Sequence, residues 1–377
     1  MNIDKLPDDC LLHIFNFFDK FETLQDCSQV CERWQYLVLQ RLSNVKYLTD
    51  SANIEYYPVS STILYREDDR IGQIELSEWF PKLRIIENSG KADCFSNPTV
   101  DGLLLTSANL ENFTYCNPSL KMLAVHDPFD FFTNDIQGPT LNQLYVRYCP
   151  ISQFGKYAKY FPNLKRLHIS NFTLDNYEDG VYTGPTLEKL EILEAIGHSQ
   201  WGSRYDYHGF SLADHCPILK SAHHYIDRDE EFYANIGIKN HFLEDLVIDL
   251  NVTPAWSILR RVLYKYPNLK HLAIREDFDT GITNENVIEI IQRFPHITLI
   301  DIRNSEKVDA NATRYIDQFC RDHNRSISLF YQKRPKITKS WPNLSAKSTR
   351  IGRGLDFMKH CFLKDYNGLP YLLDPDE

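Results

Sequence analysis

Short apolar runs recur along most of this chain and share one pattern. Each has an optional aromatic residue, Pro, a variable residue, Leu, two variable residues, Leu, a variable residue, and Ile or Val. Two clear members are FPNLKRLHI from Phe161 and YPNLKHLAI from Tyr266. The last apolar positions alternate with polar ones, as in a strand with one buried face. Because Pro ends a preceding helix and favours extended backbone, the pattern predicts one strand per run.

These runs are regularly spaced. Their first apolar positions are 141, 164, 187, 219, 243, 269 and 297, at intervals of 23, 23, 32, 24, 26 and 28 residues. Helical segments such as WSILRRVLYKY and NENVIEIIQRF lie between them, and this alternation predicts parallel strands. The rhythm resembles leucine-rich repeats, whose period is about 20 to 29 residues. Leu110 and Leu120 are too close for a full repeat, so the number of repeats between residues 50 and 120 stays open.

The first 41 residues follow a helical rather than a strand period. Pro7 and the acids Asp8 and Asp9 suit the first turn of a helix. Apolar residues then recur at helical spacing up to Val38, which predicts three short helices. Three helices within about 40 residues cannot bury that many large side chains among themselves. The surplus predicts an exposed apolar surface for a partner.

The order Leu6-Pro7, Ile14-Phe15, Leu24, Val30-Cys31 and Trp34 resembles an F-box. The departures are small, with Cys10 and Phe17-Phe18 replacing commoner residues. The resemblance implies docking onto a Skp-type adaptor, which joins a cullin–RING ubiquitin ligase. The residues expected to build that adaptor-binding face are Leu6, Pro7, Leu11, Ile14, Phe15, Leu24, Val30 and Trp34. The alternative is a helical cap with a buried Trp34.

Together the patterns predict an α/β fold with three parts. Residues 1–48 form a small all-α F-box, residues 49–332 a leucine-rich-repeat solenoid, and residues 333–377 a basic C-terminal segment or cap. The solenoid is expected to be a horseshoe with parallel strands on its concave face. Eight to ten strands would give an inner face about 40 Å long, which suits a protein partner better than a metabolite.

Composition narrows the class of protein. The 377 residues carry a formal charge of −10, which argues against a nucleic-acid footprint over the whole surface. No run of about 18 apolar residues indicates a membrane span, and the acidic start MNIDKLPDDC does not fit a signal peptide. Nine scattered cysteines without a C-x-x-C pair fit reduced core residues. We therefore expect an intracellular protein, cytoplasmic and/or nuclear.

Two segments could carry substrate specificity. The longest interval between repeats, from Leu187 to Leu219, holds Trp201, Tyr205, Tyr207 and Phe210. Trp and Tyr are residue types that dominate binding interfaces. The alternative is that these aromatics fold back onto the flank of the solenoid. Residues 333–355 hold seven basic residues and no acid, including Lys333, Arg334 and Lys336. This segment fits substrate contact, an import signal, a cap or a solvated tail.

The sequence predicts no catalytic or metal site and no cofactor. His215, Cys216, His223 and His224 match no zinc spacing, and the acids of residues 227–232 fit a solvated loop. We expect the substrate-recognition subunit of a Skp–cullin–F-box ubiquitin ligase, which brings an unknown target protein to ubiquitination and degradation without catalysing a step itself. The alternatives are a leucine-rich-repeat scaffold without ligase function and a receptor with a small-molecule cofactor, for which no residue argues.

Overall fold

The computed structural model describes residues 3–51, 53–66, 74–88, 100–105, 120–126, 138–173, 180–199, 207–227, 234–251, 255–276, 280–331 and 337–375. The chain forms two compact units, residues 1–141 with 349–351, and residues 142–348 with 352–377. The sequence predicted boundaries after residues 48 and 332 instead. The N-terminal helices belong to the first unit together with residues far beyond 48, because Phe21 packs against Trp79 and Phe80, with ring centroids 5.8 and 5.9 Å apart.

Residues 3–51 begin with a short 3₁₀ turn, η1 (Ile3–Lys5), and continue with the expected helices α1 (Asp8–Phe15), α2 (Phe21–Ser28) and α3 (Glu32–Leu42). The carbonyl of Pro7 accepts the N–H groups of Cys10 and Leu11, so α1 begins directly after this proline. The apolar positions at helical spacing meet in one small core. Its buried members are Leu11, Phe15, Phe21, Leu24, Leu37, Val38 and Leu42.

The rest of the first unit is built on short parallel strands. These are β1 (Tyr47–Thr49), β2 (Thr62–Leu64), β3 (Ile85–Asn88), β4 (Gly102–Leu105) and β5 (Met122–Val125). They lie in the order β5-β4-β3-β1-β2, and the short helices η2 (Ile54–Tyr56), η3 (Val59–Ser61) and α4 (Leu76–Trp79) connect them. The repeat pattern missed β4, whose run PTVDGLLL has Val100 in place of the first Leu and Leu105 in place of the final Ile or Val. Leu110 lies outside the described residues, whereas Leu120 precedes β5 as a repeat leucine should.

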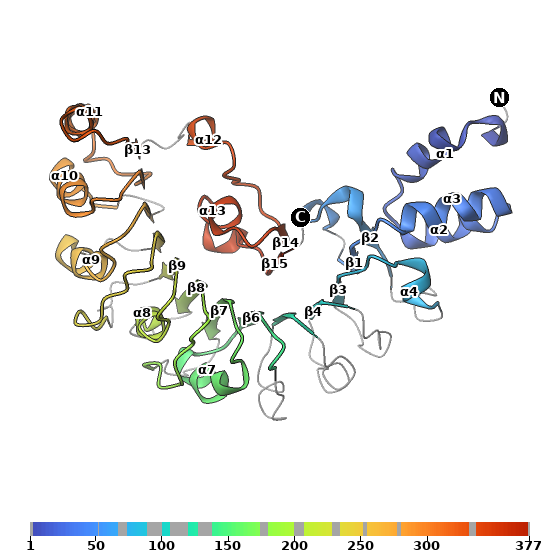
Figure 1. Ribbon diagram of the computed structural model, residues 1–377, viewed down its shortest axis with the longest axis horizontal. Helices are drawn as coiled ribbons and strands as arrows, with labels where there is room; N and C mark the ends of the chain where they lie inside the picture. The colour runs from blue at the N-terminus through green and yellow to red at the C-terminus, as the bar shows by residue number, and fades with distance from the viewer. Residues whose placement is uncertain are drawn as a thin grey trace. The chain divides into compact units, whose positions relative to one another are not determined.

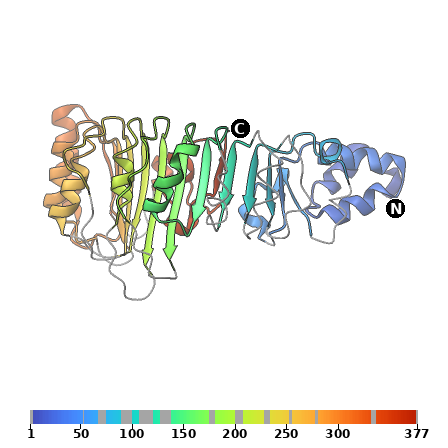
Figure 2. The same cartoon turned by 90° about the horizontal axis from the view of Figure 1, so that it is seen from below.

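The second unit repeats one strand per run, as the pattern predicted. Its strands are β6 (Gln143–Arg147), β7 (Arg166–Thr173), β8 (Ile192–Ser199), β9 (Ser221–Ile226), β10 (Asp245–Leu250), β11 (His271–Glu276), β12 (Leu299–Asp301) and β13 (Ser328–Phe330). They lie side by side in chain order (Figure 2), and each strand pairs with the next in parallel. One apolar row crosses them in register, through Leu144, Leu167, Leu193, Ala222, Leu246, Leu272 and Ile300.

Helices cover one face of the sheet that β6 to β13 form. They are α7 (Ile151–Tyr157), η6 (Ala158–Tyr160), α8 (Gly209–Ala213), α9 (Trp256–Leu263), α10 (Asn284–Arg293) and α11 (Ala310–His323). The first apolar position of each repeat lies beneath them and is at most 4% exposed at Leu164, Leu187, Leu219, Leu243, Leu269 and Ile297. Strand, helix and buried leucine therefore recur together, which is consistent with a solenoid.

The C-terminal segment covers the opposite face of the same sheet (Figure 1). We call residues 337–348 and 352–375 the C-terminal strap, and the sheet face beneath it the strap face. The strap contains α12 (Ile337–Ser340), most of β14 (Ile351–Arg353), α13 (Phe357–His360), η7 (Tyr366–Gly368) and β15 (Leu372–Asp374). Its apolar residues form one buried cluster with strand residues of β8 to β12. The inner face was expected to suit a protein partner, but in the second unit the chain itself occupies that face, which favours the cap among the roles left open for the C-terminal segment.

Candidate functional site

The N-terminal helices expose several large apolar side chains. Val30 is 59% exposed, Phe17 72%, Tyr36 67% and Ile3 45%. Single exposed apolar residues are common on protein surfaces, but four within the first 36 residues form an unusual local excess. These helices are thus suited to bind a partner through apolar contacts.

The structure divides the eight residues predicted to bind an adaptor. Pro7 and Val30 are exposed, whereas Leu6, Ile14 and Trp34 are half-buried and available at the surface. The remaining three, Leu11, Phe15 and Leu24, are at most 1% exposed. We correct their predicted role accordingly: in this structure they support the helices and do not face a partner directly.

Trp34 connects the buried and exposed parts of this region. Its ring contacts Phe15 edge-on, with centroids 5.3 Å apart. Its indole Nε1 has no hydrogen-bond partner within the described part of the chain. The neighbouring Arg33 donates to the carbonyl of Leu6 and lies 2.6 Å from the carboxylate of Asp8. Arg33 thereby fixes the start of α1 against α3, a role that sequence spacing alone could not indicate.

The polar side of the strap face binds the backbone of the strap. The side-chain amide of Gln143 both donates to Leu373 O and accepts from Leu373 N, the latter over 2.9 Å. Arg166 donates to the carbonyls of Pro370 and Tyr371, at 2.6 and 2.9 Å. Strand side chains therefore hold the strap as they would hold an extended peptide.

A buried ion pair lies at the centre of these contacts. Arg166 and Glu194 are 1% and 0% exposed, and their charged groups lie 3.0 Å apart. The thiol of Cys361 donates to the same carboxylate over 3.1 Å. Burial raises the pKa of Cys361 well above its usual value, and the Glu194 charge adds to this shift. Burial also lowers the pKa of Lys364 to about 8. The thiol is thus protonated and poorly suited to act as a nucleophile.

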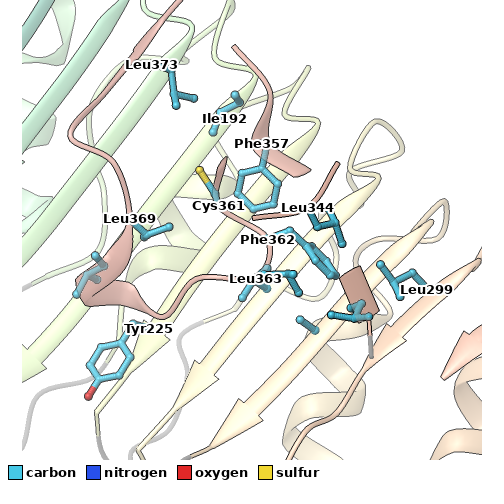
Figure 3. Packing of buried hydrophobic residues seen from close by; sticks show 14 residues of the cluster. Ile192, Tyr225, Leu299, Leu344, Phe357, Cys361, Phe362, Leu363, Leu369 and Leu373 are labelled. Carbon is cyan, nitrogen blue, oxygen red and sulfur yellow. The ribbon is translucent and has the colours of Figure 1, made fainter. Parts of the chain in front are cut away.

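Apolar contacts complete the strap face. Figure 3 shows Phe357, Cys361 and Phe362 of the strap in one cluster with Ile192 and Leu299 of the strands. Nearby, the Tyr366 ring stacks on Tyr225 with centroids 3.7 Å apart. Buried apolar area on this scale is typical of a protein core. The strap is thus an integral part of the second unit.

The predicted substrate residues are not an exposed group. Trp201 and Tyr205 lie outside the described residues. Tyr207 is 7% exposed and Phe210 is 0% exposed. The Tyr207 hydroxyl contacts Ala195 O and His224 Nδ1, at 3.0 and 2.7 Å. Tyr207 and Phe210 are therefore core residues, which corrects the expectation that they anchor a substrate and supports the alternative of aromatics folded onto the flank.

The basic C-terminal residues divide in a similar way. Lys339 and Lys347 are exposed, whereas Lys333, Arg334 and Lys336 lie outside the described residues. Arg350 belongs to the first unit, where it forms an ion pair with Glu87, a carboxylate that is 1% exposed. At least one of the seven basic residues is thus structural rather than free to bind a substrate.

The histidines considered as metal ligands are separated by the strand. His223 bonds to Asp249 on the strap face over 2.9 Å, while the next residue, His224, bonds to Tyr207 inside the other layer. This is the alternation expected of neighbouring strand residues. Within the described ranges, no group of three or more His, Cys, Asp or Glu residues is arranged to hold a metal ion. Likewise, no described helix is long and apolar enough to cross a membrane.

Comparison with known proteins agrees with the N-terminal observations. An F-box-like family model matches residues 3–43, which include α1, α2 and α3. F-box-like regions generally bind Skp1-type adaptors and indicate a general role as a ubiquitin-ligase adaptor. No curated protein matches the chain.

Proposed function

We propose that this chain is the substrate-recognition subunit of a Skp–cullin–F-box ubiquitin ligase. The observation that carries the proposal is the F-box-like match at residues 3–43 together with the exposed apolar side chains of the same helices. Such a subunit makes and breaks no bond itself. It raises the local concentration of a target protein beside the enzyme that carries ubiquitin.

The repeat units would then supply the substrate contacts. The strap covers the strap face of β6 to β13. The substrate would therefore meet the exposed side of the strap or the ends of these strands. The exposed basic residues Lys339 and Lys347 favour contact with an acidic or phosphorylated segment. The compartment expected for this function is the cytoplasm, the nucleus or both.

Adaptor binding is the first test. Val30→Asp would place a charge among the exposed apolar side chains and should weaken adaptor binding at least tenfold, measured by calorimetry with a purified Skp-type adaptor. Ile236→Asp is the matched control, because Ile236 is 49% exposed but lies in the second unit. The Leu6→Ala, Pro7→Ala double variant should also lose the adaptor, with the second unit still folded.

Ligase function needs a second test. Proteins captured by both the wild type and Val30→Asp, but ubiquitinated only with the wild type, would be candidate substrates. Affinity purification with mass spectrometry after proteasome inhibition measures both properties. Unchanged adaptor binding by Val30→Asp and by the double variant would favour the alternative, a repeat scaffold whose N-terminal helices only cap the first unit.

A further inference from the structure

A cavity of about 340 Å³ opens where the ends of β9 to β12 meet residues 363–367 of the strap. Its walls include Tyr225, Asp249 and Arg275 from the strands and Asp365 and Tyr366 from the strap. All of these residues belong to the second unit. The volume is at the small end of the range for ligand sites and is enough for one long side chain with part of its backbone.

Two arginines of this cavity keep donors available for a ligand. Arg275 lies 2.9 Å from Asp249 through Nε and donates to Lys364 O through Nη2. Arg303 binds the Asp301 carboxylate through Nε and donates to Leu363 O through Nη2. Within the described part of the chain, Nη1 of each arginine makes no hydrogen bond. Arg275 is 8% exposed and lines the cavity, so an acceptor placed there can bind its Nη1.

The chemistry of that acceptor follows from what the arginines already bind. Each guanidinium faces one carboxylate, which offsets its charge and makes a second anion unfavourable. Each also takes a backbone carbonyl from the strap. A neutral carbonyl of a second extended segment, lying beside the strap, would satisfy Nη1 in the same way.

The remaining lining favours a positive charge. Three carboxylates, on Asp249, Glu276 and Asp365, stand against the two guanidinium groups, so the formal charge of the lining is −1. The aromatic pair of Tyr225 and Tyr366 lies at the same cavity, and a ring face attracts cations. A basic side chain therefore complements the cavity in charge, and its aliphatic stem can contact the rings.

We propose that this cavity binds a Lys or Arg side chain of an extended segment in a partner protein, whose backbone carbonyls accept from Arg275 and Arg303. The inference rests on the proposed function, because the partner would be the ligase substrate. It assigns one element of the substrate, a basic extended segment that binds at the ends of the strands, apart from the acidic segment expected at Lys339 and Lys347.

Peptide pools provide the probe for this site. Five fluorescent pools Ac-XXZXX-NH₂, with Z fixed as Lys, Arg, Glu, Asp or norleucine, are titrated against the purified full chain. Fluorescence anisotropy should show tighter binding of the Lys and Arg pools than of the other three. The preference should weaken as salt is raised, since the site is open to solvent. Equal binding of all five pools would overturn the inference.

Two strap aspartates make a matched pair of variants. Asp365 accepts the N–H of Gly368 at 2.9 Å, and Asp356 accepts the N–H of Lys359 at 3.0 Å, so each caps a short helix. Asn keeps that acceptor and removes the charge. Asp365→Asn should weaken binding of the Lys pool about 2- to 5-fold, the range of one partly exposed charge pair, while Asp356→Asn should not.

The opposite change tests the sign of the effect. Asn367 also lines the cavity, and Asn367→Asp should strengthen binding of the Lys pool by a similar factor. Equal losses in Asp365→Asn and Asp356→Asn, or weaker binding in Asn367→Asp, would contradict the proposal. Adaptor binding is measured separately in all three variants. If the chain prefers basic peptides but does not bind the adaptor, the proposed site stands and the proposed ligase function is wrong.

Discussion

Gln143 of β6 and Leu373 of β15 exchange two hydrogen bonds although 230 residues separate them in the sequence. The side-chain amide of Gln143 offers one donor and one acceptor, the same pair that a strand backbone presents. One glutamine thereby fixes the end of the strap in both position and direction. Both residues are at most 2% exposed, so water cannot replace either bond.

Removing this amide should loosen the strap. Gln143→Ala leaves the N–H and the carbonyl of Leu373 buried without partners, which should lower the free energy of unfolding of the second unit by about 1 to 3 kcal/mol. Urea unfolding measures the loss, and limited proteolysis should cut the strap earlier. Gln318→Ala is the control, because the Gln318 amide bonds to the exposed side chains of Asp322 and Arg321. Equal stability of the two variants would contradict the anchoring role.

The Arg166–Glu194 pair should show strong energetic coupling. Glu194→Gln leaves the Arg166 charge buried and should destabilise the unit by about 3 to 5 kcal/mol. The double variant Arg166→Met, Glu194→Leu removes both charges and should cost clearly less than the sum of the two single changes. A double-mutant cycle on urea unfolding free energies measures the coupling, and strict additivity would rule it out.

Replacing the buried Arg41 should stabilise the protein. Its side chain lies near the end of α3 and is 3% exposed, and none of its three guanidinium nitrogens has a hydrogen-bond partner within the described part of the chain. Burial lowers the pKa of this guanidinium. Arg41→Met keeps the apolar stem and removes the buried charge, so the melting temperature of the first unit should rise, with a gain of about 1 to 3 kcal/mol. Arg33→Met, which loses the contact with Asp8, should give no such rise.

Buried histidines should make the second unit sensitive to acid. Burial and the neighbouring His223 lower the pKa of His224 to about 3, and burial with Arg166 also lowers the pKa of His168. Below about pH 6.5 the unfolded chain therefore binds protons that the folded chain does not, and stability should fall as pH falls. Each such histidine adds a slope of at most about 1.4 kcal/mol per pH unit, down to its folded pKa.

Variants can show whether His224 causes this pH dependence of stability. Urea unfolding between pH 7 and 4 should show a smaller pH dependence for His224→Gln than for the wild type. His296→Gln, at an exposed position before β12, is the control and should leave the slope unchanged. An identical slope in all three proteins would show that His224 does not control the acid response.

The sequence predicted local periodicity well. The strands of the second unit fall on the repeated Leu-x-x-Leu-x-Ile pattern. Along each run, side chains alternate between the helix side and the strap side of the sheet. The N-terminal helices and the F-box-like region were also predicted correctly, since helical spacing and the order from Leu6 to Trp34 are both local signals.

Contacts distant in sequence were not predicted. The repeat pattern predicted an inner face of the sheet, but not that Gln143, Arg166 and Glu194 bind the strap there. Their partners lie about 170 to 230 residues away, and no spacing rule indicates them. Tyr207 and Phe210 were misread for a related reason. An aromatic-rich interval has the same composition whether it binds a partner or packs onto its own flank.

The strap has a consequence for how the chain reaches its native state. The strands β6 to β13 precede the whole strap in the sequence, so a ribosome completes them before the segment that covers them exists. Until then Arg166, Glu194 and the apolar residues around Ile192 are unprotected, and exposed apolar surface of this kind favours aggregation. Closing a 230-residue loop is also entropically costly and slow, so docking of the strap should be a late step in folding. A nonsense mutation between β13 and β15 would thus release a chain that has every repeat but an uncovered apolar strap face. Such a chain should itself be degraded.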